Sequence, residues 1–158
     1  MKDTALKIIK EAPAAYLTTT GLDGYPETRA MLNLRNEKSF PKLKSFWDGF
    51  NEFEIFFTTN TSSSKIGQIK NNTKVSLYYC NPASWLGLMM NGDIEIFNDK
   101  EVIKKLWQEE WTMYYPGGYN DPDHTVLRFI PKRVKMYCLW LYTSCFKGFA
   151  SFRTEAET

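Results

Sequence analysis

Apolar and polar residues along this chain alternate mainly with the two-residue period of a β-strand. Helical periodicity is confined to short stretches. It predicts helices over residues 3–12 and 64–71, and a third helix that begins after residue 98. The segments that predict strands are residues 14–20, 25–34, 54–59, 74–80, 85–97, 125–130 and 134–142, with a turn at residues 131–133 before the last.

Short helices cannot supply the crossovers that a parallel sheet needs, so the pattern predicts an antiparallel sheet of six to seven strands with a few flanking helices. Closing that sheet into a barrel would remove its exposed edges. A chain of 158 residues can bury one substantial core but not two. We therefore expect one mainly β (α+β) domain over residues 1–142, followed by a polar, frayed tail over residues 143–158.

Three local features refine this prediction. Residues 36–51 combine turn formers with aromatic residues and predict a loop or short helix that covers the sheet. Gly92, inside the long fifth strand, predicts a bulge or bend. Asn98, followed three residues later by Glu101, predicts a capping box at the start of the third helix.

Composition narrows the functional classes. The net charge is +2 with acidic and basic residues mixed, which gives no case for a nucleic-acid partner. Aromatic residues make up 16% of the chain, enough to supply a core, an interface or a site for a ring-shaped ligand. No stretch reaches transmembrane length, and the polar first residues do not form a signal sequence. These features indicate a cytoplasmic protein with no membrane partner.

The cysteine and histidine content disfavours metal and triad chemistry. Cys80, Cys138 and Cys145 are an odd number without close spacing, which is typical of thiols in a reducing compartment. The single histidine, His124, lies outside any zinc-binding spacing, and no Gly-x-Ser-x-Gly elbow accompanies it. We expect His124 to be a solvated loop residue.

The most informative stretch runs from Phe56 to Gln68. It leaves an apolar strand, passes through a series of hydroxyl side chains and ends at Lys65, where a helix is predicted to start. Hydroxyls, an ammonium group and a helix N-terminus together suit an anion, although a serine-rich capping turn would give the same pattern. On the second strand, alternation places Arg29 on one face with Glu27 and Met31; it is either an exposed arginine or one that faces a bound anion.

Four segments, in order, carry a family resemblance over roughly residues 3–142. They lie in the first hairpin, around Lys65, in the fifth strand and in the aromatic segment before the sixth strand. The chain resembles the pyridoxamine-phosphate-oxidase-like FMN-binding split barrels, in particular their general-stress-protein branch. The segments are Leu17-Thr18-Thr19-Thr20 with Gly24, Pro26 and Arg29-Ala30-Met31; Phe56-Phe57-Thr58-Thr59 with Ser64-Lys65; Asn91-Gly92-Asp93-Ile94-Glu95-Ile96; and Leu106-Trp107 with Tyr114-Tyr115-Pro116-Gly117-Gly118, Asp121-Pro122, Leu127-Arg128-Phe129 and Pro131.

The resemblance implies a homodimer that binds FMN in the clefts between its subunits. Carried over residue by residue, Arg29 and Lys65 would hold the FMN phosphate, because a guanidinium and an ammonium suit a dianion. Hydride chemistry would then belong to the flavin. The resemblance further assigns Ser64 and Thr59 to hydrogen bonds with the phosphate, Ala30, Met31, Leu32 and Thr58 to the isoalloxazine ring, and Tyr114 to the lining of the cleft.

Two departures from the oxidase pattern bear on activity. The chain has Ser64-Lys65 where the oxidases carry Arg-Lys, and its last strand lacks the Trp and Arg residues that bind pyridoxal phosphate, so oxidation of pyridoxamine phosphate is not expected. Three functions stay open. They are an FMN-dependent oxidoreductase acting on an unidentified small molecule with a donor such as NADH or NADPH, a non-catalytic flavin-binding stress or carrier protein, and a split-barrel dimer that binds haem or no cofactor.

Overall fold

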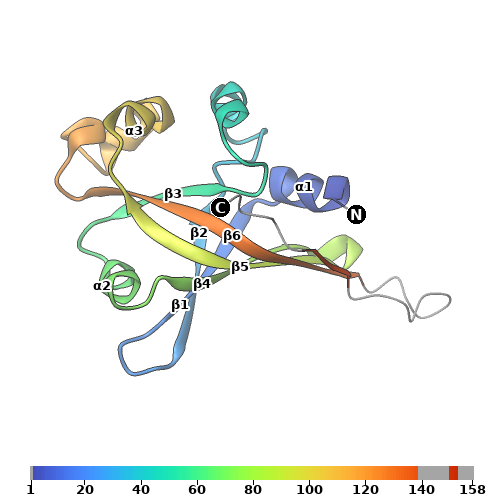
Figure 1. The fold of residues 1–158 in the computed structure, drawn as a ribbon. Coiled ribbons are helices and arrows are strands. Elements are labelled where there is room, and N and C mark those ends of the chain that lie inside the picture. Colours follow the sequence, from blue (N-terminus) through green and yellow to red (C-terminus); the bar gives the residue numbers. More distant parts are fainter. Residues whose placement is uncertain (1, 139–149, 153–158) are drawn as a thin grey trace.

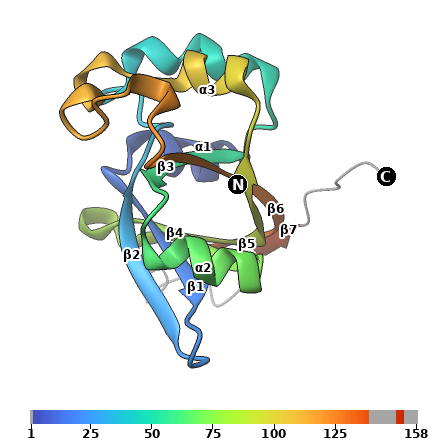
Figure 2. The same cartoon turned by 90° about the vertical axis from the view of Figure 1, so that its left-hand side faces the viewer.

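The computed structural model describes residues 2–138 and 150–152. Its strands form one curled antiparallel sheet, flanked by short helices (Figures 1 and 2). This confirms the predicted mainly β split barrel of six to seven strands. None of the helices in the described ranges has the length and apolar character needed to cross a membrane. In chain order the elements are α1 (Lys2–Glu11), β1 (Ala14–Thr20), β2 (Pro26–Leu32), η1 (Pro41–Leu43), η2 (Ser45–Gly49), β3 (Ile55–Asn60), α2 (Ser64–Asn71), β4 (Lys74–Asn81), η3 (Pro82–Ser84), β5 (Leu86–Phe97), α3 (Lys100–Leu106), η4 (Glu109–Met113), η5 (Gly118–Asn120), β6 (His124–Cys138) and β7 (Ala150–Phe152).

The order of the strands in the sheet leaves a gap in the barrel. The strands run β2-β1-β4-β5-β6-β3, and β7 adds to β6. The edge strands β2 and β3 therefore lie at the two ends of the ladder, and in the described chain no ladder joins them. In Figure 2 the strands curl around a common interior, and α2 lies in front of it. The gap between β2 and β3 is where the side chains discussed below meet.

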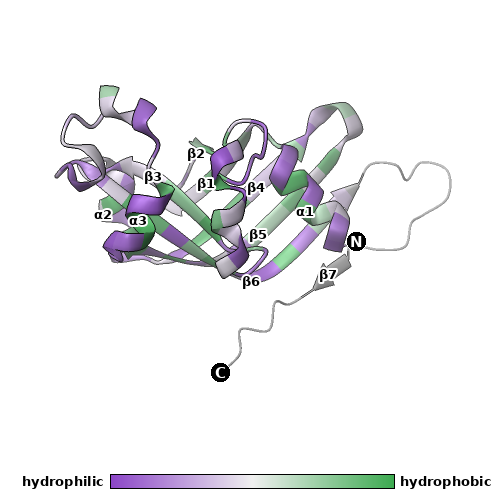
Figure 3. Ribbon diagram, turned by 90° about the horizontal axis from the view of Figure 1, so that it is seen from above, coloured by the Kyte–Doolittle hydropathy of each residue, from purple (hydrophilic) through white to green (hydrophobic). Residues whose placement is uncertain are grey.

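The main core fills the inside of the curled sheet. The inward-facing residues of the strands supply most of it, which explains why apolar positions concentrate on the strands in Figure 3. The apolar stripe predicted for the first helix is confirmed, since Ala5, Ile8 and Ile9 of α1 are buried in this core. Ile66 and Ile69 of α2 are buried there too. Both helices are thus held by the same core as the sheet.

A second, aromatic cluster packs around Phe56. The segment with η1 and η2 supplies one side of this cluster, which confirms that residues 36–51 cover the sheet, and α3 with η4 supplies the other. Much of the aromatic content is therefore internal. The cluster comprises buried Leu34, Leu43, Phe56, Leu106, Trp111, Tyr115 and Val126, with partly buried Phe40, Phe46, Trp47, Phe50, Phe97, Val102, Ile103 and Trp107.

Two predicted boundaries are wrong. The expected turn at residues 131–133 does not exist, because β6 continues through it as one strand. Gly92 pairs with Pro131 and Asn91 pairs with Arg133, so a bulge takes up the extra residue and the ladder resumes. The helix α3 is capped by Asp99 rather than Asn98: the Asp99 carboxylate accepts hydrogen bonds from the two backbone amides that follow Lys100, at 3.0 and 3.1 Å.

The end of the chain is described only in part. Residues 139–142 of the last predicted strand lie outside the described residues. Within the predicted tail, Ala150–Phe152 forms β7, which pairs with β6 opposite Val134 to Met136. Structure is therefore present in a segment that composition alone predicted to be frayed.

The bulge at Gly92 leads to a testable prediction about stability. A Cβ at this position would lie 2.1 Å from the carbonyl oxygen of Ile130, a backbone atom that cannot turn away. Gly92→Ala is therefore expected to lower the free energy of unfolding by about 1–3 kcal/mol, the usual size of overpacking. Gly67→Ala is the control, because Gly67 lies inside α2 and nothing outside the helix's own backbone comes within 4 Å of its added Cβ. Alanine there should stabilise by about 0.5–1 kcal/mol.

Urea denaturation of both variants measures the difference. Equal stability of Gly92→Ala and wild type would show that the strand can shift without cost and would contradict this account of the bulge.

Candidate functional site

Arg29 projects from β2 toward the gap between the free edges of the sheet. Its side chain is only 20% exposed, which rejects the alternative of a solvated surface arginine. Nη1 donates to Thr19 Oγ1, and Nη2 donates to Gln68 Oε1 at 3.2 Å. Thr19 lies diagonally across the β1–β2 ladder from Arg29 on the same face, and Gln68 comes from α2. Arg29 is therefore fixed between the hairpin and α2.

Lys65 reaches the same region from the first turn of α2. Its Nζ donates to Thr59 Oγ1 at 2.7 Å and to Ser63 Oγ at 3.0 Å. These partners are neutral hydroxyls, and Lys65 forms no ion pair with any carboxylate of the described residues. The N-terminus of α2 adds its partial positive charge to this region. An ammonium group so placed is available to a negatively charged ligand.

The two cations are close enough to influence each other. Partial burial lowers the pKa of Lys65 below its ordinary value, and the positive charge of Arg29 lowers it further. Like charges that disfavour one another become favourable partners when an anion lies between them. The electrostatics of this site therefore suit an anion better than a neutral ligand.

A carboxylate and a buried amide complete this arrangement. Glu27 Oε2 lies 2.9 Å from Arg29 Nη2, and Glu27 Oε1 accepts a hydrogen bond from Gln68 Nε2 at 2.6 Å. Gln68 is 3% exposed and also accepts from the Thr19 hydroxyl at 2.6 Å. We name these four residues, Thr19, Glu27, Arg29 and Gln68, the arginine network.

Several members of the site were not anticipated from sequence. Gln68 follows Lys65 by three residues and so shares its helix face, which is a usable signal. Thr19 and Glu27 are opposite each other in the β1–β2 register, which the hairpin pattern could have suggested. Ser63 was not singled out either; its hydroxyl accepts a hydrogen bond from Lys65, while the neighbouring Ser64, the residue assigned to the phosphate, is exposed.

The other predicted ligand residues divide between two faces of the sheet. Met31 faces the interior with Arg29 and is buried, whereas Ala30 and Leu32 are exposed on the outer face of β2. Thr59 contacts Lys65, but Thr58, one residue earlier, faces the aromatic cluster. Tyr114 is 68% exposed, and no hydrogen bond within the described chain joins it to Arg29 or Lys65. The structure thus brings together Arg29, Thr59 and Lys65 but not the whole predicted set.

His124 is not the solvated loop residue that the sequence predicted. It begins β6 and is half-buried, with its ring edge-on to Trp107 and Tyr115 at centroid distances of 5.2 and 4.8 Å. Nδ1 lies 3.2 Å from the carbonyl oxygen of Tyr119 and must donate to it, so Nε2 accepts the hydrogen bond from the Thr58 hydroxyl at 2.7 Å. Burial lowers the pKa of His124 and favours this neutral form.

The donor set at the gap fits a phosphate monoester. Such a group carries about −1.5 to −2 charges near neutral pH and accepts several hydrogen bonds. Arg29 and Lys65 offer two positive charges, and the hydroxyls of Thr59 and Ser63 lie within hydrogen-bond distance of the ammonium. The residues present therefore fit the phosphate end of FMN, the group that the family resemblance implies.

Known structures with similar folds cover nearly the whole chain. A Clostridium acetobutylicum protein related to general stress protein 26 of B. subtilis is 26% identical, with a TM-score of 0.73 over 96% of this chain and 92% of that one. General stress protein 26 from Bacillus anthracis str. Sterne is 18% identical, with a TM-score of 0.66 over 85% and 92%. A NimC/NimA family protein from Clostridium acetobutylicum is 19% identical, with a TM-score of 0.63 over 96% and 91%.

Comparison with curated protein sequences gives no match. A model of the family described as pyridoxamine 5'-phosphate oxidase like, however, matches residues 2–141. That match spans most of the chain and includes both β2 and α2, the elements that carry Arg29 and Lys65. The chain belongs to the pyridoxamine 5'-phosphate oxidase-like family.

Proposed function

We propose that this protein binds FMN, with Arg29 and Lys65 holding the phosphate. The observation that carries this proposal is the Lys65 ammonium group, which is partly buried beside a second cation and has only hydroxyl partners in the described chain. A partly buried ammonium group that lies near a second cation and has no carboxylate partner is costly to maintain and is favoured where an anionic ligand binds.

The remaining contacts to FMN follow from the position of the phosphate. Thr59 and Ser63 would share the phosphate with Lys65, and Ser64 would offer its hydroxyl at the start of α2. Apolar residues of β2 next to Arg29 would border the flat ring, as small-ligand sites generally provide. We assign Ala30, Met31 and Leu32 to this border, with Thr58 and Tyr114 as further candidates to line the cleft.

A second copy of this chain is the proposed partner of the outer sheet face. Tyr16 on β1 is paired with Ala30 on β2 and with Tyr78 on β4, and Tyr78 is paired with Met89 on β5. Tyr16, Tyr78 and Leu32 are 37%, 38% and 50% exposed, which makes this row an apolar surface. It is continuous with Ala30 and Leu32 of the proposed flavin site, so a dimer across this face would place the flavin between subunits.

The proposed activity is that of an FMN-dependent oxidoreductase in the cytoplasm, acting on a small molecule with a donor such as NADH or NADPH. Bound FMN supplies hydride transfer, and this chain's residues supply binding and orientation. Anaerobic addition of NADH or NADPH separates this activity from simple flavin carriage. Bleaching of the flavin absorption, followed by reoxidation with turnover, supports an enzyme, whereas an unchanged spectrum supports a carrier.

Mass spectrometry of the ligand released by denaturing the purified protein tests the proposal directly. We expect FMN, at close to one molecule per chain, together with a dimer by sedimentation velocity at micromolar concentration. Haem, or protein that stays colourless after incubation with FMN, would contradict flavin binding. FMN bound to a monomer would be consistent with the proposed phosphate site but would contradict the proposed dimer.

A further inference from the structure

Glu27 is placed where it competes with an anionic ligand for Arg29. Its carboxylate contacts Arg29 Nη2 at 2.9 Å, and the same nitrogen donates to Gln68 Oε1 at 3.2 Å. Nη2 of Arg29 therefore already has two partners within the protein, Glu27 and Gln68. A phosphate that approaches this edge of the guanidinium must share it with Glu27 or displace it.

Charge gives a second reason for competition. Arg29 and Lys65 contribute two positive charges and Glu27 one negative charge, so the three side chains together carry +1. A phosphate monoester carries about −1.5 to −2. Glu27 therefore leaves the site with less positive charge than the ligand could use, and it repels the phosphate directly. Because Glu27 is 48% exposed, its carboxylate can move into solvent without becoming an unpaired buried charge, at the cost of the hydrogen bond that it accepts from Gln68 Nε2.

We propose that Glu27 is a specificity-determining residue of the phosphate site. It occupies Arg29 when no ligand is bound and limits the affinity for doubly charged phosphate groups, so that the flavin exchanges more readily. This inference rests on the proposed binding of FMN through Arg29 and Lys65. The opposite role, a positioning residue that holds Arg29 in place for the ligand, predicts the opposite effect of mutation.

The decisive variant is Glu27→Gln, which removes the charge and retains a side chain of the same shape. We expect it to bind FMN about 3- to 20-fold more tightly than wild type, the effect of removing one like charge near a partly exposed dianion. Riboflavin, which lacks the phosphate, should bind equally to both proteins. Glu11→Gln makes the same change of net charge on α1, across the molecule from α2 (Figure 1), and should leave both affinities unchanged.

Fluorescence titration with FMN and with riboflavin, together with inorganic phosphate as a competitor of FMN, gives the readout. Equal or weaker FMN binding by Glu27→Gln would overturn the proposal. Glu27→Ala is a second variant, which also removes the hydrogen bonds; tighter FMN binding by this variant supports competition, and weaker binding supports a positioning role. If the wild-type protein binds no FMN, the proposed function itself fails. If the wild-type protein binds FMN but the Glu27 variants bind it no more tightly, only the inference about Glu27 fails.

Discussion

Replacing Lys65 with methionine is expected to weaken FMN binding about 10- to 150-fold. This range corresponds to about 1.5–3 kcal/mol, the net value of a hydrogen bond to a charged group. Among the described residues the Lys65 ammonium group donates hydrogen bonds to the hydroxyls of Thr59 and Ser63 and pairs with no carboxylate, so its loss leaves no buried carboxylate unpaired. Fluorescence titration of the apoprotein with FMN measures the change, which should come from ligand binding rather than from misfolding.

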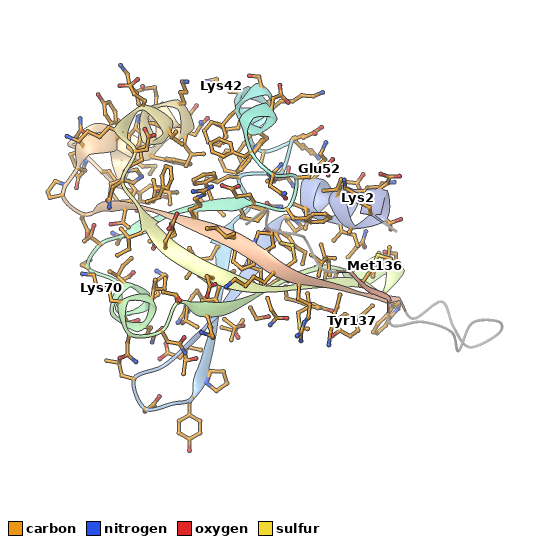
Figure 4. All side chains as sticks on the ribbon, viewed as in Figure 1. Lys2, Lys42, Glu52, Lys70, Met136 and Tyr137 are labelled. Carbon is orange, nitrogen blue, oxygen red and sulfur yellow. The ribbon has the colours of Figure 1, made fainter. Side chains whose placement is uncertain are left out.

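The matched control is Lys70→Met. Lys70 lies on the same helix as Lys65, but it is exposed and projects from the outer side of α2 (Figure 4). This variant should bind FMN like wild type, because a screened surface charge contributes little. Unchanged FMN affinity in Lys65→Met would remove Lys65 from the site, and an equal loss in both variants would reduce its role to general electrostatic attraction.

Replacing Arg35 with methionine is expected to destabilise the fold by about 3–5 kcal/mol, because two carbonyl oxygens lose their charged donor at about 1–3 kcal/mol each and the packing of the guanidinium is lost as well. Arg35 is 7% exposed. Its guanidinium donates to the carbonyl oxygen of Glu54 at 2.7 and 3.0 Å and to that of Asn51 at 2.6 Å, and it stacks over Trp47 at 4.0 Å. It thereby ties the chain after β2 to the chain before β3, where the described ladder leaves the barrel open.

Burial lowers the pKa of Arg35 to about 10, so the group is still charged at neutral pH and its carbonyl partners are needed. Methionine would fill part of the volume but leave those carbonyls without a donor. Lys42→Met, in the same covering segment, is the control, because Lys42 is exposed at the molecular surface (Figure 4). It should change the free energy of unfolding by no more than about 0.5 kcal/mol. If Arg35→Met lowers the free energy of unfolding by less than about 1 kcal/mol, the hydrogen bonds of Arg35 between the segments after β2 and before β3 contribute little to stability, and this account of Arg35 is wrong.

The sheet was predictable because its signals are local. Alternation located β1 to β5 to within a few residues, but it divided β6 into two strands and did not identify β7. The helix from Ser64 to Asn71 was predicted with the correct bounds, after the hydroxyl-rich turn. The errors arose where a tertiary contact overrides a local signal. Pro131 normally ends a strand, yet it is accommodated here by the bulge opposite Gly92, a partner that is far away in the sequence.

The site was predictable only in its charged residues. Arg29 and Lys65 stand out because Arg29 is the one cation of its predicted strand, residues 25–34, and Lys65 directly follows a series of hydroxyl side chains. Gln68 and Glu27 do not stand out, because their importance depends on α2 lying against the hairpin. Likewise, the turn formers before His124 predict a polar loop, but Trp107 after α3 and Tyr115 after η4 pack their rings against the His124 ring.

The affinity of the wild-type protein for FMN relative to riboflavin tests the central claim most directly, since the two flavins differ only in the phosphate. If Arg29 and Lys65 hold that phosphate, FMN should bind at least about 10-fold more tightly than riboflavin, with the difference decreasing as salt is raised. Equal affinities of the two flavins would contradict the account, whatever the protein does with the ring.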